Sequence, residues 1–374
     1  MRWSGQLVEK SQGEDAQGES MRTGQLELFG GAVARTFDTP EFRGMTFYEV
    51  QAKSVLNRVP GEMPWFSWTI NPYRGCTHAC VYCFARKTHT YLDLDAGHDF
   101  DSRIVVKVNA PQVLRRELAR PSWQREHVAM GTNVDCYQRA EGRYRMMPQI
   151  IETLAAADTP FSILTKGTLI LRDLAALEQA AQRVSVGLSF SIGFTDEQLW
   201  RTVESGTPSP LRRLEAVHKL NESGLGCGVL MAPILPYLTD SPSRLRATVA
   251  AIAQAGARSI VPIVLHLRPG AREWYASWLA QNHPGLVERY RALYRGGSYA
   301  DKRYQRRITE QVLGYAREFG IDRESGGGPR RVTPTARHDD NNTAGRSGAS
   351  DHAADGRESG ALPDSPAPEQ LRLL

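Results

Sequence analysis

The stretch NPYRGCTHACVYCFAR, residues 71–86, contains three of the five cysteines of the chain. Cys76, Cys80 and Cys83 have the spacing Cys-x3-Cys-x2-Cys, and Tyr82 directly precedes the last of them. Thiolates are the usual ligands of iron–sulfur clusters, which ordinarily take four. Three local thiolates leave one iron open to an exogenous ligand, and an open position is how metal sites generally bind a substrate or cofactor. The spacing therefore predicts a [4Fe–4S] cluster with one open iron.

A zinc site is the alternative for the same stretch. Cys3His coordination would recruit His78 or His89 as the fourth ligand. Structural zinc sites more often use two separated ligand pairs, whereas these three cysteines fall within eight residues. The sequence favours the cluster over zinc. An odd number of cysteines with one tight group also does not indicate a disulfide framework.

Around this stretch, short apolar runs alternate with helical patterns. Strands alternating with helices predict βα units, a parallel sheet and right-handed crossovers. About six units indicate an α/β fold, a partial (β/α)6 TIM-like barrel, with functional residues at the carboxyl ends of its strands. The cysteines directly follow the first barrel strand. The apolar runs are FSWTI (66–70), RIVVKV (103–108), HVAMG (127–131), FSILT (161–165), RVSVGLSFSI (183–192), GCGVLMAPI (226–234) and SIVPIVLHL (259–267).

Composition divides the chain into four parts. Residues 1–44 are rich in Gly, Gln, Ser and charge, and residues 321–374 contain no aromatic residue, so both ends are predicted to be disordered. Residues 45–270 are expected to form the barrel core, and 271–320 a helical extension packed on it. No signal peptide or apolar run of about 18 residues is found, which predicts a cytoplasmic protein without a membrane span. The formal net charge of +5 permits a nucleic-acid or other acidic partner.

The cysteine spacing resembles the CxxxCxxC signature of radical S-adenosylmethionine (SAM) enzymes, which place an aromatic residue before the third Cys. INPYRGCTHACVYCFAR (70–86), GTNVDCYQRAE (131–141), ILTKG (163–167) and APILPYLTD (232–240) more narrowly resemble the spore photoproduct lyase-like branch. The resemblance covers roughly residues 45–320. It implies a partial barrel of the radical SAM type, whose open iron binds the amino and carboxylate groups of SAM. It also implies an electron donor such as flavodoxin or ferredoxin.

The resemblance implies a reaction as well. Reductive cleavage of SAM yields methionine and a 5′-deoxyadenosyl radical, which abstracts hydrogen from a substrate. The substrate stays open: nucleic acid, as for a DNA photoproduct lyase, is one option, and protein or small molecules are others. The alternative function is a non-catalytic, metal-stabilised (zinc or Fe–S) nucleic-acid-binding protein.

Candidate SAM-binding residues lie at the strand ends. Thr132 and Asp135 follow the second core strand, where the superfamily commonly contacts the SAM amino group through a Gly-Gly-Glu-like motif; this sequence departs from that motif. An Asx turn is the alternative for Asp135. Lys166 ends the third strand and is expected to contact the SAM carboxylate, with an ordinary surface lysine as the alternative. Ser189 lies on the inward face of the fourth strand and is expected to bind the ribose or carboxylate; the alternative is a strand-end serine bonded to the backbone.

Further candidates follow from the same resemblance. Glu204 and either Arg212 or Arg213 lie in VESGTPSPLRRLEA (203–216); Arg212 is expected to clamp the SAM carboxylate, with a solvated helix face as the alternative. Cys136 is a candidate hydrogen donor to a substrate radical, with an ordinary free thiol as the alternative. His266, at the last strand end, either faces the substrate or is a satisfied barrel histidine. A last set suits either nucleic acid or an ordinary charged surface: Arg139, Arg143, Arg145, Lys302, Arg303, Arg306 and Arg307.

Overall fold

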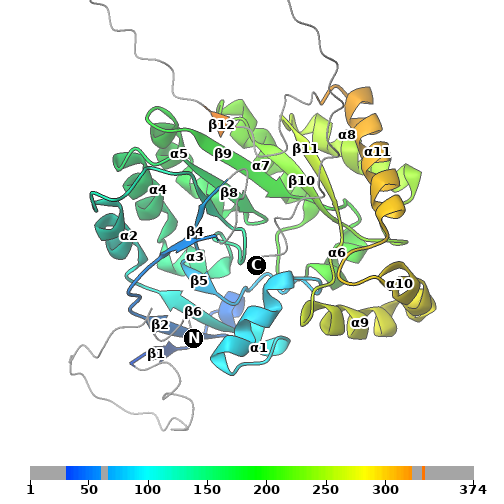
Figure 1. The fold of residues 1–374 in the computed structure, drawn as a ribbon, viewed down its shortest axis with the longest axis horizontal. Coiled ribbons are helices and arrows are strands. Elements are labelled where there is room, and N and C mark those ends of the chain that lie inside the picture. The colour runs from blue at the N-terminus through cyan, green and yellow to red at the C-terminus, as the bar shows by residue number, and fades with distance from the viewer. Residues whose placement is uncertain (1–30, 60–65, 322–330, 333–374) are drawn as a thin grey trace, which may run out of the picture.

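The computed structural model describes residues 31–59, 66–321 and 331–332. Six neighbouring parallel strands form the main sheet (Figure 1). They are β4 (Trp68–Ile70), β7 (Val128–Met130), β8 (Phe161–Thr165), β9 (Val186–Ser191), β10 (Gly228–Ile234) and β11 (Ile260–Val264). β3 (Leu56–Arg58) pairs antiparallel with β4, and β12 (Arg331–Val332) pairs antiparallel with β9. Because β11 and β3 do not pair within the described residues, the sheet is an open, partial barrel, which confirms the predicted α/β fold.

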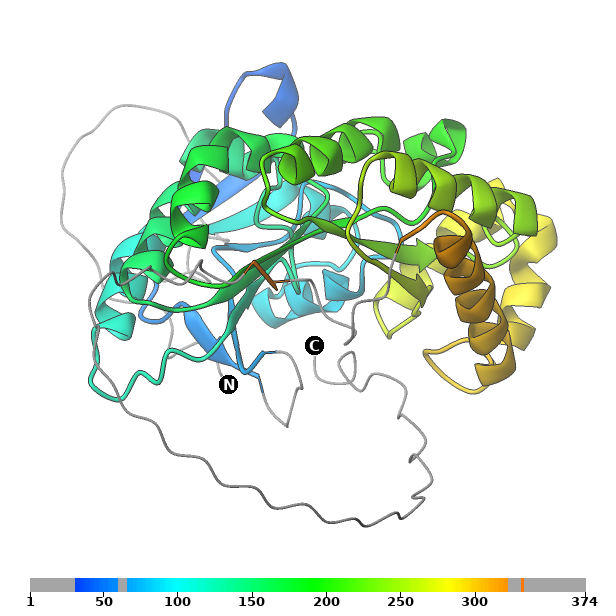
Figure 2. The same ribbon diagram turned by 90° about the horizontal axis from the view of Figure 1, so that it is seen from above.

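Helices cover the outer face of this sheet (Figure 2). They are α2 (Ala110–Leu118), α4 (Met147–Ala156), α5 (Leu174–Ala181), α7 (Pro210–Glu222) and α8 (Pro242–Gln254). α7 and α8 begin at Ser–Pro pairs, in which the serine hydroxyl accepts a backbone N–H and the proline occupies the first helical position. Their apolar faces, including Leu220 and Ile252, are buried against the sheet.

A second, smaller sheet supports the cysteine stretch. Its order is β1 (Val33–Arg35), β2 (Thr46–Val50), β6 (Arg103–Lys107) and β5 (Tyr73–Arg74). The predicted run RIVVKV therefore forms a strand outside the barrel. β5 pairs antiparallel with β6 and ends at Arg74, two residues before the first cysteine.

The prediction of disorder for residues 1–44 is wrong for residues 31–44. These residues contain β1 and the 3-10 helix η2 (Pro40–Phe42). Phe37 and Phe42 pack against Phe47, with ring centroids 5.3–5.7 Å apart. These two aromatic side chains offset the ordering entropy that the polar composition of the segment suggests it could not overcome. Residues 1–30 lie outside the described residues.

The range 271–320 contains helices α9 (Ala271–Asn282), α10 (Val287–Leu293) and α11 (Lys302–Glu318), with η5 (Pro284–Leu286) between the first two. α11 buries Ile308, Val312 and Ala316 and lies beside α8 (Figure 1). The predicted C-terminal tail lies outside the described residues, apart from its start and β12. No described helix is long and apolar enough to cross a membrane.

Candidate functional site

The three cysteines lie on one loop between β5 and the 3-10 helix η3 (Phe84–Leu92). Cys76 and Cys80 are buried, and Cys83 is half-buried. Gly75 turns the chain into this loop with φ +77°, a conformation that side chains disfavour. Burial raises the pKa of all three thiols. A bound cation would stabilise their thiolates, so the donor set fits a metal cofactor.

The kind of metal group can be judged from this donor set. Within the described residues, no three His, Cys, Asp or Glu side chains converge as ligands of a single ion. A cubane cluster makes a different demand, since each thiolate binds a different iron. His78 Nδ1 lies 3.3 Å from the Asp135 carboxylate, and His89 Nε2 lies 2.9 Å from the Arg103 carbonyl oxygen. Both histidines of the zinc alternative thus have other partners.

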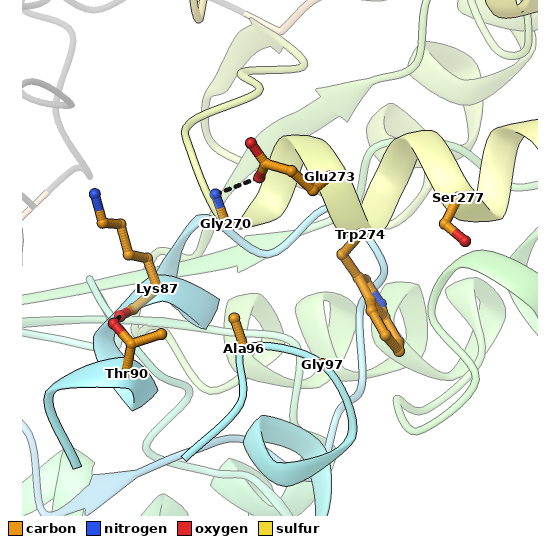
Figure 3. A pocket seen from close by; sticks show the side chains of 8 residues that line it. All are labelled: Lys87, Thr90, Ala96, Gly97, Gly270, Glu273, Trp274 and Ser277. Carbon is orange, nitrogen blue, oxygen red and sulfur yellow. Dashed lines mark hydrogen bonds between the residues drawn. The ribbon is translucent and has the colours of Figure 1, made fainter. Parts of the chain in front are cut away.

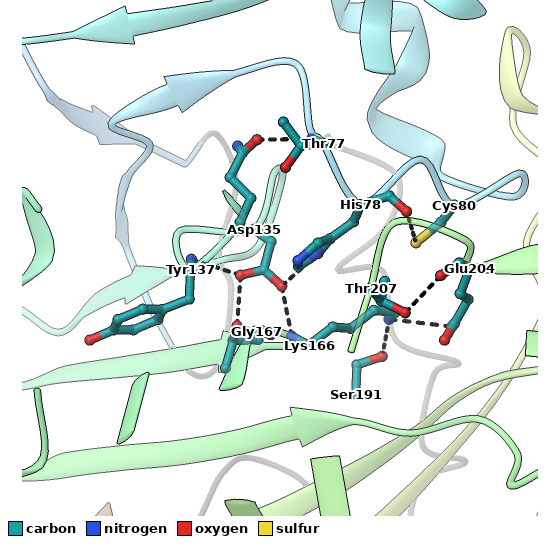
Figure 4. Close-up of polar contacts among 12 residues, drawn as sticks. Thr77, His78, Cys80, Asp135, Tyr137, Lys166, Gly167, Ser191, Glu204 and Thr207 are labelled. Atoms are coloured by element: carbon teal, nitrogen blue, oxygen red, sulfur yellow. Dashed lines mark hydrogen bonds and ion pairs between the residues drawn. The ribbon is translucent and has the colours of Figure 1, made fainter. Parts of the chain in front are cut away.

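A second loop, residues 135–139 after β7, holds the cysteine loop in place (Figure 4). The Gln138 amide donates to the Gly75 carbonyl (3.0 Å) and accepts from the Thr77 backbone N–H (2.9 Å). The Thr77 hydroxyl in turn accepts from the Arg139 backbone N–H (3.1 Å). Gln138 is fully buried, so both bonds form away from water. The backbone on each side of Cys76 is fixed by one side chain from another element.

Asp135 joins three segments of the site. Its carboxylate accepts from the Thr165 hydroxyl and the Lys166 backbone N–H, each at 2.6 Å, and from the Tyr137 backbone N–H at 2.8 Å. Burial works to raise the pKa of Asp135, but His78 and the hydrogen bonds outweigh it and lower that pKa to about 2. The bond to Tyr137 forms the Asx turn that the sequence left as the alternative. The Asp135 carboxylate oxygens already accept hydrogen bonds from protein donors. Asp135 therefore positions the segments of the site.

A buried ionic network lies across the loop from Asp135 (Figure 4). The Glu204 carboxylate accepts from the Tyr82 hydroxyl and the Arg213 guanidinium, and it lies 4.0 Å from the Lys166 ammonium. Lys166 also donates to the Ser191 hydroxyl. Burial works to raise the pKa of Glu204, but Arg213 and Lys166 outweigh it and lower that pKa. The network places one partly exposed cation, Lys166, beside the cysteine loop.

The two candidate arginines have different surroundings. The Arg212 side chain is exposed on α7, whereas Arg213 is 1% exposed and donates to the Ser191 carbonyl oxygen (2.9 Å) as well as to Glu204. Successive helical residues are rotated by about 100°, so neighbouring positions on one helix face different surroundings. The inward arginine is therefore the other member of the pair.

Two hydroxyls of the predicted set have no hydrogen-bond partner among the described residues. Ser189 is 3% exposed, and within that part of the chain neither its Oγ nor the buried Oγ1 of Thr132 forms a hydrogen bond. A buried hydroxyl without a partner is costly. These atoms lie in β9 and in the loop after β7, and they are suited to a polar cofactor.

Cys136 and His266 occupy different surroundings. Cys136 is 1% exposed, and burial raises its thiol pKa well above the usual value. The His266 ring lies 4.5 Å from the Tyr299 ring, and burial, with Arg268, lowers its pKa to about 4. Cys136 therefore lies in the protein interior beside the Asp135 turn, and His266 lies at the end of β11.

Three contacts of the cysteine loop were not anticipated from the sequence. Arg86 is fully buried and donates to the Cys80 carbonyl oxygen (2.9 Å) and to Asp101. A Cβ at Gly206 would lie 2.2 Å from the Thr77 carbonyl oxygen, so only glycine allows this approach. Gln138 is the third. Arg86 could have been found from its place at the end of the cysteine stretch, but no local signal marks the other two.

A surface hollow of about 490 Å³ lies between η3 and α9 (Figure 3). Lys87 and Thr90 line one side, and Glu273, Trp274 and Ser277 line the other. The Glu273 carboxylate accepts from the Gly270 backbone N–H (2.5 Å) and caps α9. The hollow contains none of the cysteines and lies apart from the polar network.

Comparisons with known proteins bear on this arrangement. A family model described as the radical SAM superfamily matches residues 70–246. An uncharacterized protein of Mycobacterium tuberculosis is 52% identical over 282 residues, which cover 75% of this chain and 83% of the relative. An uncharacterized protein of Methanocaldococcus jannaschii is 29% identical over 192 residues, covering 51% and 69%. Spore photoproduct lyase complexed with dinucleoside spore photoproduct has a similar fold, with TM-score 0.55, 17% identity, and coverage of 73% and 79%.

Proposed function

Because this chain belongs to the radical SAM superfamily and is an enzyme using a [4Fe–4S] cluster and SAM, we propose that Cys76, Cys80 and Cys83 hold the cluster. The observation that carries the proposal is that three thiols, two buried and one half-buried, share one loop, which contacts from Asp135 and Gln138 after β7 and from Glu204 hold in place. Thiolates are the usual ligands of such clusters. With SAM bound, the cluster supplies reductive cleavage to methionine and a 5′-deoxyadenosyl radical.

The chain's own residues would then bind and orient SAM. The Ser189 and Thr132 hydroxyls, to which no residue in the described part of the chain bonds, are suited to hydrogen bonds with its polar groups. The Lys166 ammonium has three N–H donors, of which Ser191 and Glu204 take two at most, so one is left for a carboxylate. Glu204 and Arg213 hold that ammonium in place.

Other parts of the proposal concern substrate and partners. An external electron donor such as flavodoxin or ferredoxin would reduce the cluster. A nucleic acid is the proposed substrate class, supported by the exposed Arg143 of α3 (Arg139–Tyr144) and the exposed arginines of α11. The Cys136 thiol is proposed as a hydrogen donor to the substrate radical. A donor thiol exchanges with solvent, so product formed in D2O should carry deuterium, and Cys136→Ala should lose that label.

Anaerobic reconstitution tests the cluster assignment. The protein should be brown, bind about four irons per chain and release 5′-deoxyadenosine from SAM on reduction. Replacing Cys76, Cys80 or Cys83 by Ala should abolish both iron binding and cleavage. Cys227→Ala is the matched control, because Cys227 is equally buried but lies at the start of β10. Stoichiometric zinc without SAM cleavage, or full activity of a ligand variant, would refute the assignment.

A further inference from the structure

One edge of the site carries a concentrated positive charge. Residues 287–307 contain seven Arg or Lys and two acids, Glu288 and Asp301, a net charge of +5. The formal charge of all 374 residues is also +5, so the remainder of the chain is neutral as a whole. Every one of the seven cations has an exposed side chain. Among the described residues, Arg291 alone of the seven forms an ion pair, with Glu288.

Buried tyrosines attach this segment to the carboxyl ends of the barrel strands. The Tyr290 hydroxyl donates to the Pro236 carbonyl oxygen after β10, and the Tyr294 hydroxyl donates to the Leu265 carbonyl oxygen after β11, each at 2.7 Å. The Leu267 backbone N–H donates to the Ser298 carbonyl oxygen (2.8 Å). In Figure 1, α10 and the start of α11 lie side by side at this end of β11. The charged surface therefore lies at the carboxyl ends of β10 and β11, the same end of the parallel sheet at which the β7, β8 and β9 ends contribute the site residues.

The aromatic side chains are divided between anchoring and contact roles. Tyr290 and Tyr294 are buried, so they cannot stack with a ligand on the outer surface. Tyr299 and His266 are half-buried at the strand end, and the Arg268 guanidinium lies 5.8 Å from the centre of the Phe84 ring, next to Cys83. Partly exposed rings near the site, with cations farther out, match the arrangement by which proteins bind bases and phosphates.

We propose that residues 287–307 form a docking surface for the phosphate backbone of single-stranded nucleic acid and direct one base toward the site. The inference rests on the proposed function, since it names the substrate class of the same site. A single strand fits better than a duplex because enzymes that act on a base must take it out of the stack. Charge without outward stacking residues predicts binding that is independent of sequence and sensitive to salt.

The test is nucleic-acid binding by the full-length, cluster-reconstituted protein, measured by fluorescence anisotropy. The probes are fluorescein-labelled oligothymidylate and oligouridylate, which separate DNA from RNA as the source of the phosphates. The variant is Lys302→Gln/Arg303→Gln/Arg306→Gln. Its control is Arg115→Gln/Arg116→Gln/Arg120→Gln, because those three arginines are equally exposed around α2, on the opposite side of the sheet (Figure 1).

The α11 variant should bind either oligonucleotide at least about tenfold more weakly than the wild type near physiological salt. The magnitude of the slope of log K against log salt should fall by about 2. The control should bind as the wild type does, and both variants should keep its unfolding temperature. Equal binding by the α11 variant, an equal loss in the control, or displacement by polyglutamate as effective as by oligonucleotide would overturn the proposal. SAM cleavage by the wild-type protein tests the proposed function separately.

Discussion

Arg213→Ala should destabilise the protein strongly, whereas Arg212→Ala should not. Arg213 and Glu204 are each 1% exposed and form an ion pair, and Arg213 also donates to the Ser191 carbonyl oxygen. Removing one partner of a buried pair costs about 3–5 kcal/mol because the other charge stays buried. The Glu204 carboxylate would retain Tyr82 and a lysine 4.0 Å away, which offset part of the loss. We expect the free energy of unfolding to fall by about 3 kcal/mol.

Urea-induced unfolding, monitored by circular dichroism with no reductant added, measures the free energy of unfolding of each variant. Arg212→Ala should change the free energy of unfolding by less than about 0.5 kcal/mol, as exposed substitutions usually do. A double variant, Arg213→Met/Glu204→Leu, removes both charges and should recover part of the stability; the recovery is incomplete because the Tyr82 hydroxyl and the Lys166 ammonium then lose the Glu204 carboxylate. The reasoning is refuted if Arg213→Ala costs less than about 1 kcal/mol, or if Arg212→Ala costs as much.

Three further predictions concern the cysteine loop. Gly206→Ala should lower iron content per chain, because its Cβ would meet the Thr77 carbonyl oxygen at 2.2 Å, while Gly314→Ala, which meets nothing within 4 Å, should not; full iron content in the first would count against the close approach. Gln138→Leu removes two buried hydrogen bonds, so the free energy of unfolding should fall by about 2 kcal/mol and the iron bound after reconstitution should decrease. Unchanged iron content would show that the cysteine loop keeps its conformation without Gln138. Burial lowers the pKa of His89 to about 4, so the contribution of His89 to stability, measured as the difference between wild type and His89→Gln, should fall by about 3 kcal/mol as pH drops from 6.5 to 4 and stay level above 6.5; a His89→Gln variant with the same slope would contradict this assignment.

The sequence predicted those features that depend on local spacing. The cysteine triplet, the apolar runs of the six barrel strands and the strand-end positions of Lys166 and Ser189 all follow from local patterns. An apolar run indicates a strand but not its neighbour, so RIVVKV could not be assigned to the second sheet. The polar average composition of the first 44 residues likewise predicted disorder, although Phe37 and Phe42 in that range pack on Phe47 of β2.

The contacts that complete the site depend on chain segments far apart in sequence. Gln138 reaches Gly75 across 63 positions, and Tyr82 reaches Glu204 across 122. Arg212 and Arg213 are adjacent, and the sequence does not show which of them the rotation of α7 turns inward. Local patterns therefore located the three cysteines proposed to hold the cluster but not the residues that position their loop or the inward arginine.

The contacts that position the cysteine loop come from residues that are synthesised well after the cysteines. The loop is complete by residue 83, yet contacts from Asp135, Gln138, Glu204 and Gly206 position it. A chain still under synthesis at that point has its thiols but not the surroundings that set their spacing. The loop should therefore reach its final geometry for cluster binding only after the chain has folded through β9 and α6 (Glu197–Val203).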